Sequence, residues 1–193
     1  MAYKKIAISV IIPIAVAAIL IVPWAALQRT YAQSDIANTI LKMHNDERNA
    51  VRSPALTWSD SLAADAKSWA DHLVTLNQGK PIDTLTRSDI PHSKQGTHGE
   101  NIAQRGAWGT GPVSPPSTAS LVKGWIDEKP WRGGPLGQND GDHYTQMVWK
   151  NTKEVGCAIA TSNEKSSHGM AGVVAYLVCR YSPPGNIAGE EPY

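Results

Sequence analysis

The segment that decides the fold covers residues 142–152 and reads Asp142-His143-Tyr144-Thr145-Gln146-Met147-Val148-Trp149-Lys150-Asn151-Thr152. It sets an ionisable imidazole beside an apolar run that contains a tryptophan. A second segment follows further along the chain and reads Tyr176-Leu177-Val178-Cys179-Arg180-Tyr181-Ser182-Pro183-Pro184-Gly185-Asn186-Ile187.

Together these two segments resemble the paired signatures of the CAP superfamily, which includes cysteine-rich secretory proteins, insect antigen 5 and plant pathogenesis-related proteins. The resemblance extends from His44 to Tyr193. Helix-like segments precede and flank a few strand-like runs, and that order predicts an α+β fold. The resemblance sharpens this to a CAP-type α-β-α sandwich with a small, mostly antiparallel sheet between helices. It indicates the fold more firmly than the activity, because one scaffold serves many functions.

The N-terminal residues have the pattern of a secretory leader. Lys4 and Lys5 form a positive start, an apolar run follows from Ile6 to about Val22, and residues 30–32 offer a cleavage site. The apolar run approaches the ~17 residues of a minimal membrane span, so an uncleaved anchor is the alternative. We expect residues 1–32 to be a signal peptide or N-terminal membrane anchor and residues 33–193 to be the CAP (SCP) domain. The domain is then secreted or held on the outer face of the cell membrane.

The composition and net charge of the chain limit the kinds of binding partner that can be expected. Hydrophobic residues make up 41% of the chain and charged residues 18%, which indicates a globular core. Without residues 1–32 the chain has 15 basic and 17 acidic residues, a formal charge of −2. No basic patch is evident, so no nucleic-acid partner is expected. The oligomeric state stays open.

The cysteine content points to one crosslink. Cys157 and Cys179 are the two cysteines of the chain, and in an exported protein two cysteines most simply form one disulfide. Two buried free thiols are the alternative. Both residues lie in strand-like apolar runs, which argues against a catalytic cysteine. The family resemblance implies that they link neighbouring strands.

Periodicity predicts the remaining elements. Three helices are expected, over residues 34–51, from Ser59 to Gly79, and from Ser117 or Thr118 to Pro130. Two strands are expected over residues 155–161 and 173–181. The stretches 80–99, 106–117 and 130–142 read as irregular loops, and loops of this length are often functional.

Three further segments match the family and have structural interpretations. His44 and Arg48 share one face of the first helix and are expected to tie it to the rest of the domain. Gly99 is expected to allow close approach of the backbone in the segment His98-Gly99-Glu100-Asn101-Ile102. The C-terminal stretch from residue 185 to residue 193 is expected to be structural.

The resemblance also implies a groove with two histidines and two acidic residues, which fall here at His92, Glu100, Glu128 and His143. Such a set suits Zn²⁺ or another divalent cation, with water completing the coordination. His98 is the rival of His92. Without the resemblance the spacing is weak support for a metal. The alternative is a hydrogen-bonded polar network that braces the loops around a cleft.

Two kinds of activity follow from this groove and its surroundings. A metal beside a carboxylate could activate water for hydrolysis, whereas Ser93 next to His92 is a poor candidate for a nucleophile–base pair. The catalytic residues are therefore unknown, and an enzyme is the less favoured interpretation. The loop 130–142 carries Trp131 and Leu136 among glycines and could form an apolar lip for a lipid or sterol. In the alternative, Trp131 packs beneath its loop.

We therefore expect an exported CAP-domain protein that acts by binding. A lipid or sterol is the leading ligand, and a His/Glu cleft is expected to hold a divalent cation. One competing class is a metal-dependent hydrolase of peptidase type. The other is an envelope or cell-surface interaction protein without a small-molecule ligand.

Overall fold

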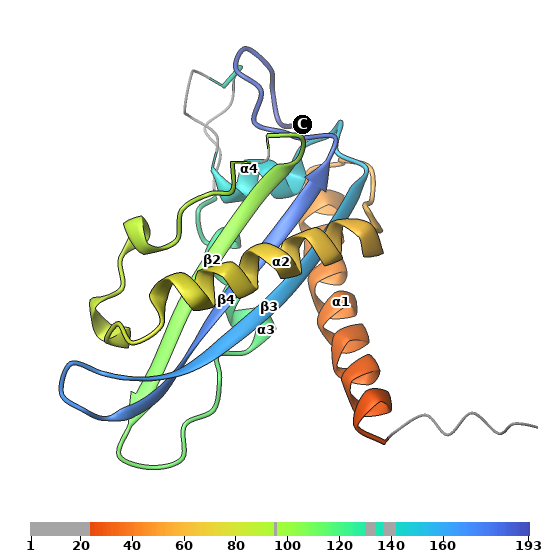
Figure 1. The fold of residues 1–193 in the computed structure, drawn as a ribbon. Coiled ribbons are helices and arrows are strands. Elements are labelled where there is room, and N and C mark those ends of the chain that lie inside the picture. The colour runs from red at the N-terminus through yellow and green to blue at the C-terminus, as the bar shows by residue number, and fades with distance from the viewer. Residues whose placement is uncertain (1–23, 95, 130–133, 137–141) are drawn as a thin grey trace, which may run out of the picture.

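The computed structural model describes residues 24–94, 96–129, 134–136 and 142–193 (Figure 1). Its helices are α1 (Trp24–Ala50), α2 (Asp60–Asn77), α3 (Thr118–Ile126) and α4 (His143–Val148). Its strands are β1 (Thr57–Trp58), β2 (Gly99–Gly109), β3 (Glu154–Lys165) and β4 (Ala171–Ser182). Two short 3₁₀ turns, η1 (Ile82–Thr84) and η2 (Arg87–Asp89), connect α2 to β2.

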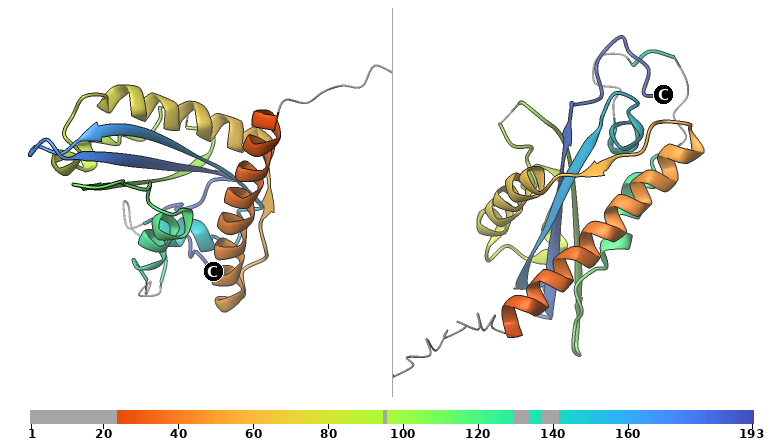
Figure 2. Two further views of the ribbon diagram at one scale, coloured as in Figure 1. Left: turned by 90° about the horizontal axis from the view of Figure 1, so that it is seen from below. Right: turned by 90° about the vertical axis from the view of Figure 1, so that its right-hand side faces the viewer.

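The strands form one mixed sheet in the order β1-β3-β4-β2. β4 pairs antiparallel with both β3 and β2, while the short β1 pairs parallel with β3. Helix α2 covers one face of this sheet, and α1, α3 and α4 lie on the other side (Figure 2). The predicted α-β-α sandwich with a mostly antiparallel sheet is confirmed.

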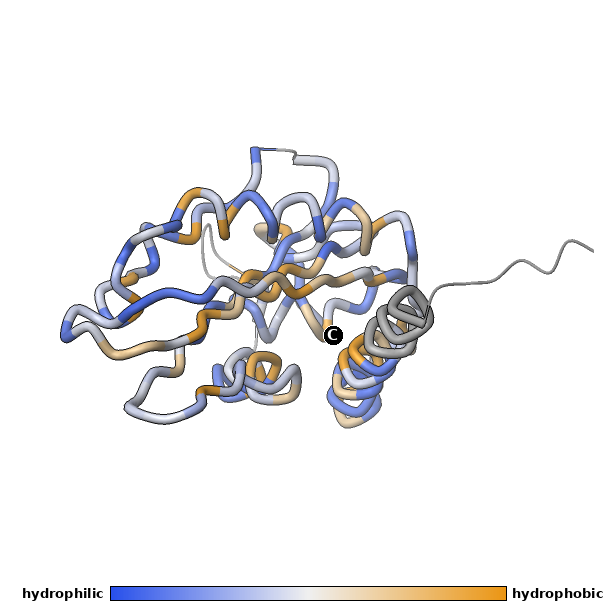
Figure 3. Tube along the Cα trace, turned by 60° about the horizontal axis from the view of Figure 1, so that its bottom comes forward, coloured by the Kyte–Doolittle hydropathy of each residue, from blue (hydrophilic) through white to orange (hydrophobic). Residues whose placement is uncertain are grey.

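Each face of the sheet has its own hydrophobic core, because successive side chains of a strand point to opposite faces. From β4, Leu177, Cys179 and Tyr181 enter the core beneath α1, α3 and α4. Tyr176 and Val178 enter the core beneath α2. Hydrophobic residues therefore concentrate along the central strands between the helical layers (Figure 3).

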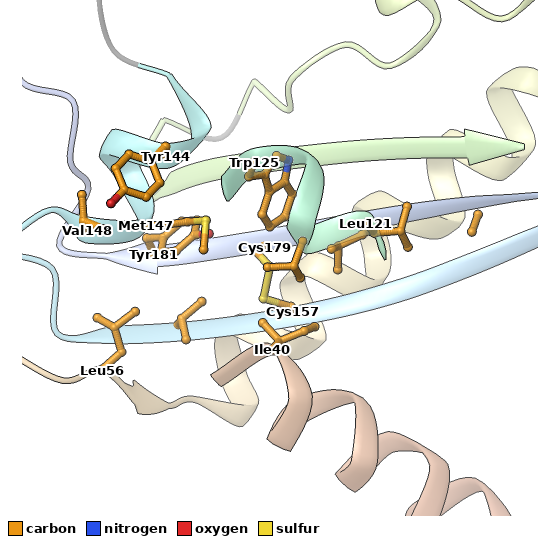
Figure 4. Close-up of a cluster of buried hydrophobic side chains, with 14 residues drawn as sticks. Ile40, Leu56, Leu121, Trp125, Tyr144, Met147, Val148, Cys157, Cys179 and Tyr181 are labelled. Carbon is orange, nitrogen blue, oxygen red and sulfur yellow. A yellow bond between two sulfur atoms is a disulfide. The ribbon is translucent and has the colours of Figure 1, made fainter. Parts of the chain in front are cut away.

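The disulfide lies inside the first of these cores. Cys157 of β3 and Cys179 of β4 stand directly opposite each other in the antiparallel register and are joined by an S–S bond. Their sulfurs pack next to Trp125, Leu121 and Ile40 (Figure 4). The predicted disulfide between neighbouring strands is confirmed, and in the chain-entropy model a loop of this length contributes about 3 kcal/mol.

The predicted helix starts fit at two of three places. Ser59 is the N-cap of α2, and Ser117 caps α3 by accepting a hydrogen bond from the backbone N–H of Ser120. Helix α1 instead begins at Trp24, ten residues before the predicted start at Ser34, and so runs through the predicted cleavage site. That site stays a prediction. None of the helices in the described part of the chain is long and apolar enough to cross a membrane.

Several elements were not predicted. They are the short strand β1, the turns η1 and η2, helix α4 and strand β2, which ends at Gly109 inside a stretch predicted to be an irregular loop. β2 contains three glycines in 11 residues, which is poor strand composition. It is a strand because its whole length pairs with β4.

A close approach between layers explains one glycine. A Cβ atom on Gly156 of β3 would lie 2.3 Å from the backbone nitrogen of Ala63. Glycine therefore lets the first turn of α2 lie directly on the sheet.

Candidate functional site

The first half of the site lies between the end of α3 and the start of α4. Asp142 caps α4: its Oδ1 accepts from the Thr145 N–H at 2.7 Å, and Thr145 Oγ1 accepts from the Asp142 N–H at 2.9 Å. This reciprocal arrangement is a capping box, and it fixes His143 in the first turn. Glu128, just beyond α3, faces that turn. Its Oε1 lies 2.6 Å from His143 Nδ1, and its Oε2 accepts from the His143 N–H at 2.9 Å.

These contacts set the charge of Glu128. Burial alone would raise the pKa of its carboxyl, but the hydrogen bond and charge of His143, together with the backbone N–H donors, hold that pKa below its usual value. The carboxylate is therefore ionised at neutral pH. The His143 ring is also stacked on the Trp125 indole, with centroids 5.8 Å apart and planes at 21°.

The second half of the site lies at the start of β2. His92 Nδ1 is 2.6 Å from Glu100 Oε1, which also accepts from the Ser93 N–H at 3.0 Å. The other carboxylate oxygen, Oε2, accepts from the Arg180 guanidinium. Arg180 also donates to Ser93 Oγ at 2.7 Å. Glu100 is only 6% exposed, so this network buries its charge against a cation.

The four predicted residues thus form two His–Glu pairs. Among the described residues, no group of three or more His, Cys, Asp or Glu side chains could hold a metal ion. The pairing register of β2 and β4 explains why the two His–Glu pairs are separate. Glu100 stands opposite Arg180, which contacts Asp65 of α2, while the next residue, Asn101, points to the other face and donates to the His143 carbonyl at 2.9 Å. The pairs are therefore held from opposite faces of β2.

The expected set of four metal ligands does not fit this arrangement. Both carboxylates already accept hydrogen bonds. Glu100 accepts from Arg180, His92 and Ser93, and Glu128 accepts from residues 143 and 144. In each pair the histidine Nδ1 must carry the hydrogen that the carboxylate accepts, so a neutral ring keeps its lone pair on Nε2. In each pair Nε2 is therefore the atom open to a cation, with the carboxylate behind the ring, an arrangement common among metal-binding histidines. Cation binding itself stays a prediction.

The rival histidine is not part of either pair. His98 Nδ1 is buried without a hydrogen-bond partner among the described residues, and it is His92 that contacts Glu100. The neighbouring Gly99 packs against the side-chain amide of Gln146, which leaves no room for a Cβ atom. The expectation of a close approach at Gly99 agrees with this contact.

The predicted apolar lip is different in the structure. Trp131 lies outside the described residues. Leu136 is buried, with 4% of its surface exposed, and its backbone forms two hydrogen bonds with the C-terminal segment, at Gly189 and Glu190. Leu136 therefore does not present an exposed side chain to a lipid, because the C-terminal segment covers it. Trp108 is 43% exposed, but it lies on β2 rather than in a loop.

A buried polar network connects helix α1 to the site. His44 donates from Nδ1 to the Ile40 carbonyl at 2.8 Å, and its Nε2 accepts from the Tyr181 hydroxyl at 2.8 Å. Tyr181 in turn accepts from Asn101 at 3.1 Å, and Asn101 holds the His143 carbonyl. Burial lowers the pKa of His44 to about 4, so the ring is neutral and can accept this hydrogen bond. The structure thus agrees with the expected role of His44.

Arg48 fixes the end of the same helix. Its guanidinium donates to four backbone carbonyls, those of Pro54, Met147, Trp149 and Thr152. Two of these belong to the turn that follows α4. Burial lowers the pKa of Arg48 to about 10, which still leaves it charged at neutral pH. The first helix is therefore tied to the segment that carries His143.

The structure adds an open pocket that sequence reasoning missed. It has a volume of about 550 Å³ and lies between α2 and the segment 91–94, and we call it the α2 pocket. Its lining residues are Asp65, Ser68, Trp69, His72, Leu76, Pro91, His92, Ser93, Lys94 and Arg180. Helical spacing of residues 65, 68, 69, 72 and 76 was a visible signal, because these positions share one face of a helix. The segment that faces them could not be foreseen.

Comparison with known proteins identifies the class. Residues 41–181 match the model of the CAP family, described as the cysteine-rich secretory protein family. The chain belongs to this family.

Two relatives illustrate its range. Pathogenesis-related protein 1C of Nicotiana tabacum is 35% identical over 159 residues, covering 79% of this chain and 78% of that protein. Venom allergen 5 of Vespa magnifica is 35% identical over 174 residues, covering 80% of this chain and 69% of that protein.

Solved structures agree on the fold. Hookworm platelet inhibitor superposes with a TM-score of 0.52 at 18% identity, over 82% of this chain and 75% of that one. The structure of BmVAL-1 gives a TM-score of 0.52 at 22% identity, over 83% of this chain and 81% of that one. At these identities the likeness concerns the fold alone.

Proposed function

We propose that this protein is an exported CAP protein that binds a hydrophobic small molecule of the lipid or sterol class. The α2 pocket is the observation that supports this most. Its volume of about 550 Å³ is in the range usual for ligand sites, about 300–1,000 Å³. Trp69, Leu76 and Pro91 give it an apolar wall, and it opens beside the His92–Glu100 pair.

The contacts of the two pairs argue against a hydrolase. Neither His92 nor His143 shares a hydrogen bond through Nε2 with a hydroxyl or thiol among the described residues, so a nucleophile–base pair is missing there. Each carboxylate already accepts from three donors, which leaves it little capacity to activate water. Peptidase inhibitor 15 of Homo sapiens, 32% identical over 190 residues that cover 89% of this chain and 66% of that protein, is by its name an inhibitor.

A divalent cation is the second candidate, because each histidine donates its Nδ1 hydrogen to a carboxylate. That contact orients the ring and leaves Nε2 as the available ligand atom. We propose His92 and His143 as ligands, with Glu100 and Glu128 behind them. This changes the role of the two acids from ligands to supports.

Export is part of the proposal. The disulfide between Cys157 and Cys179 is the kind of bond that persists in oxidising compartments. The leader-like residues 1–32 would supply the route. Analysis of the mature N-terminus in secreted and membrane fractions distinguishes cleavage from anchoring, and a protein found in the cytoplasm with its leader intact would reject both.

Native mass spectrometry of protein purified from its own host tests the binding function. We expect a retained hydrophobic molecule that organic solvent extracts and that can be identified. Zinc or another metal would appear in the same spectrum. Protein that carries no ligand, and that binds no lipid or sterol when these are offered, would instead favour an interaction protein without a small-molecule ligand.

A further inference from the structure

We infer that the second half of β2 is a docking edge for an extended acidic peptide, which adds to the sheet as a further strand beside residues 104–108. We call these residues the open edge. β2 is the outermost strand at one side of the sheet, because the strand order is β1-β3-β4-β2 (Figure 1). One of its edges pairs with β4, and no described strand lies against the other. None of the described residues that line the α2 pocket comes from β2, so peptide binding here does not depend on a ligand in that pocket.

The disulfide shows which backbone groups of β2 point out of the sheet. In an antiparallel pair, opposite residues either exchange two backbone hydrogen bonds, with Cα atoms about 5.5 Å apart, or exchange none, with Cα atoms about 4.5 Å apart. The Cα atoms of Cys157 and Cys179 are 4.1 Å apart, so this pair of β3 and β4 exchanges none. The backbone N–H and C=O of Cys179 therefore point the other way, to Asn101 of β2. Because these directions alternate along a strand, odd-numbered residues of β2 bond to β4 and even-numbered residues point outwards.

Two hydrogen bonds agree with this alternation. In the hairpin between β3 and β4, the Ser166 N–H donates to the Met170 carbonyl at 2.9 Å, as expected if even-numbered residues at the start of β4 face β3. On the far side of β2, Trp125 Nε1 of α3 donates to the carbonyl of Ile102 at 3.4 Å, so this even-numbered carbonyl does point outwards. Helix α3 thereby covers the outer edge of β2 at Ile102, and the next outward residues lie beyond that contact.

The backbone groups of the open edge have no partner in the part of the chain that the structure describes. Gln104, Gly106 and Trp108 point outwards, and no described residue outside β4 forms a hydrogen bond with their N–H or C=O groups. Each of them offers one donor and one acceptor, and the spacing of roughly 7 Å between them is that of a partner strand. An extended peptide satisfies these groups with its own backbone, whatever its side chains are.

The open edge also lacks the features that usually protect an edge strand, such as a bulge, a proline or a lysine. The register of β2 with β4 runs without interruption to Gly109. Residues 102–109 contain no proline, lysine or acidic residue, and Arg105 is their one charged residue. A regular edge that is left open in this way accepts a partner strand readily.

Two side chains beside the open edge select the peptide. Trp108 is 43% exposed and stands in register with Gly172, on the α2 side of the sheet. Arg105 lies on the opposite face, is exposed, and has no acidic partner among the described residues. A carboxylate on the added strand pairs with this guanidinium, while an apolar side chain on the strand's other face packs on the indole. The open edge therefore favours a strand that alternates acidic and apolar residues.

The charge of Arg105 also argues against a second copy of this chain as the occupant. Two copies of the open edge would pair antiparallel about a two-fold axis at Gly106, which places Arg105 opposite Ala107 of the other copy. The two Arg105 side chains would then share a face as diagonal neighbours, about 7–8 Å apart. Like charges at this distance weaken the pairing of two copies, whereas an acidic peptide gains from the same charge.

Fluorescence anisotropy of the exported protein with two labelled peptides, Val-Glu-Val-Glu-Val-Glu-Val and Val-Lys-Val-Lys-Val-Lys-Val, tests this specificity. Wild type should bind the glutamate peptide at least about tenfold more tightly than the lysine peptide. Arg105→Glu should reverse the preference. Arg52→Glu, which changes an exposed arginine just after α1, is the matched control and should behave as wild type.

Hydrogen exchange of single amides, followed by NMR, locates the peptide without any substitution. In the free protein the amides of Gln104, Gly106 and Trp108 should exchange much faster than those of residues 105 and 107, which bond to β4. Saturating glutamate peptide should slow the three outward amides at least about tenfold and leave the other two unchanged. Gln104→Pro removes one outward donor without loss of a bond to β4, and it should weaken both peptides at least about fivefold.

Each outcome decides one part of the proposal. Equal binding of the two peptides, or a preference that Arg105→Glu leaves unchanged, would overturn the acidic specificity. Unchanged exchange of the three outward amides at saturation would overturn the open edge as the docking place. Analytical ultracentrifugation checks the other occupant, because a dimer that protects the same amides without peptide would make a second copy the partner. If neither peptide binds, the proposal as a whole is wrong.

Discussion

Two arginines are buried in this domain, and they are satisfied in opposite ways. Arg48, on the α1 side, donates to the carbonyls of four residues and is completely buried. Arg180, on the α2 side, is 2% exposed and meets two carboxylates, those of Glu100 and Asp65. The first is surrounded by neutral acceptors and a closed core. The second lies in the wall of an open pocket.

This comparison indicates that the two faces of the sheet contribute differently to stability and to ligand binding. On the α1 side, hydrogen bonds from Arg48 to backbone carbonyls tie α1 to α4 and the turn after it, and the disulfide joins β3 to β4. On the α2 side, charges are retained next to a space large enough for a ligand. Stability and binding are therefore expected to respond to different substitutions.

The largest effect is expected from Arg48→Met. The change leaves four carbonyls without their donor, three of them buried and that of Pro54 partly buried. Each orphaned buried group costs about 1–3 kcal/mol, so the free energy of unfolding should fall by about 4 kcal/mol or more. Carbonyls do not titrate, so the loss should be the same at pH 7 and pH 8, above the range in which His44, whose pKa the charge of Arg48 helps to lower, takes up a proton. Chemical denaturation measures it. Lys42→Ala, which removes an exposed ion pair with Asp46, is the matched control and should cost well under 1 kcal/mol.

Arg180→Met should cost somewhat less, about 3 kcal/mol near neutral pH, because it leaves the buried Glu100 carboxylate without its cation. Chemical denaturation measures this difference as well. A penalty for Arg180→Met below about 1 kcal/mol would show that the pair contributes packing and little charge. Arg105→Met, on the exposed side of β2, is the control.

His44 should make the domain sensitive to mild acid. Its folded-state pKa of about 4 is below the unfolded value of 6.5, so the unfolded chain takes up the proton first. Stability is therefore full above pH 6.5 and is lost as the pH falls towards 4, by about 3 kcal/mol in total. Depressed carboxyl groups such as Asp89, with a pKa of about 2, act at lower pH. Unfolding curves of His44→Gln should lose the slope between pH 6.5 and 4.5, while His72→Gln, an exposed histidine, should keep it.

The smallest expected effects concern the cation. If His92 and His143 are the ligands, His143→Ala should abolish Zn²⁺ binding in a calorimetric titration. Glu128→Gln should weaken it only about tenfold, because the acid is a support. Wild-type affinity should also fall in acid, since only neutral imidazole binds metal. His98→Ala is the matched control. Equal affinity in wild type and His143→Ala would remove the cation from the proposed function.

Local patterns predicted those parts of the fold that depend on neighbours in sequence. Ser59 and Ser117 are N-caps, and caps depend on groups within one turn: Ser59 accepts from the Ala63 N–H through its carbonyl, and Ser117 accepts from the Ser120 N–H through its side chain. Cys157 and Cys179 stand in apolar runs long enough to be read as strands. Helix α4 was not predicted because it has only six residues and five of them are buried, so the sequence shows no amphipathic period there. The exposed-lip interpretation of Leu136 failed because residues 189 and 190, far along the chain, bind its backbone.

The site could be predicted in its residues but not in its connections. The resemblance placed His92, Glu100, Glu128 and His143, and the structure pairs each histidine with an acid. Their separation into two pairs depends on Arg180, which reaches Glu100 across the register of β2 and β4. The sequence around Glu100 does not reveal a partner that lies on the neighbouring strand. The α2 pocket escaped for the same reason, since one of its walls comes from a distant loop.

Helix α1 has 27 residues and is therefore about 40 Å long. It begins at the lower edge of the molecule in Figure 1 and ends near α4 at the top, where His44 and Arg48 fasten it. A leader that remained in a membrane would turn this helix into a stalk. The stalk would separate α4 from the membrane by about the length of the helix.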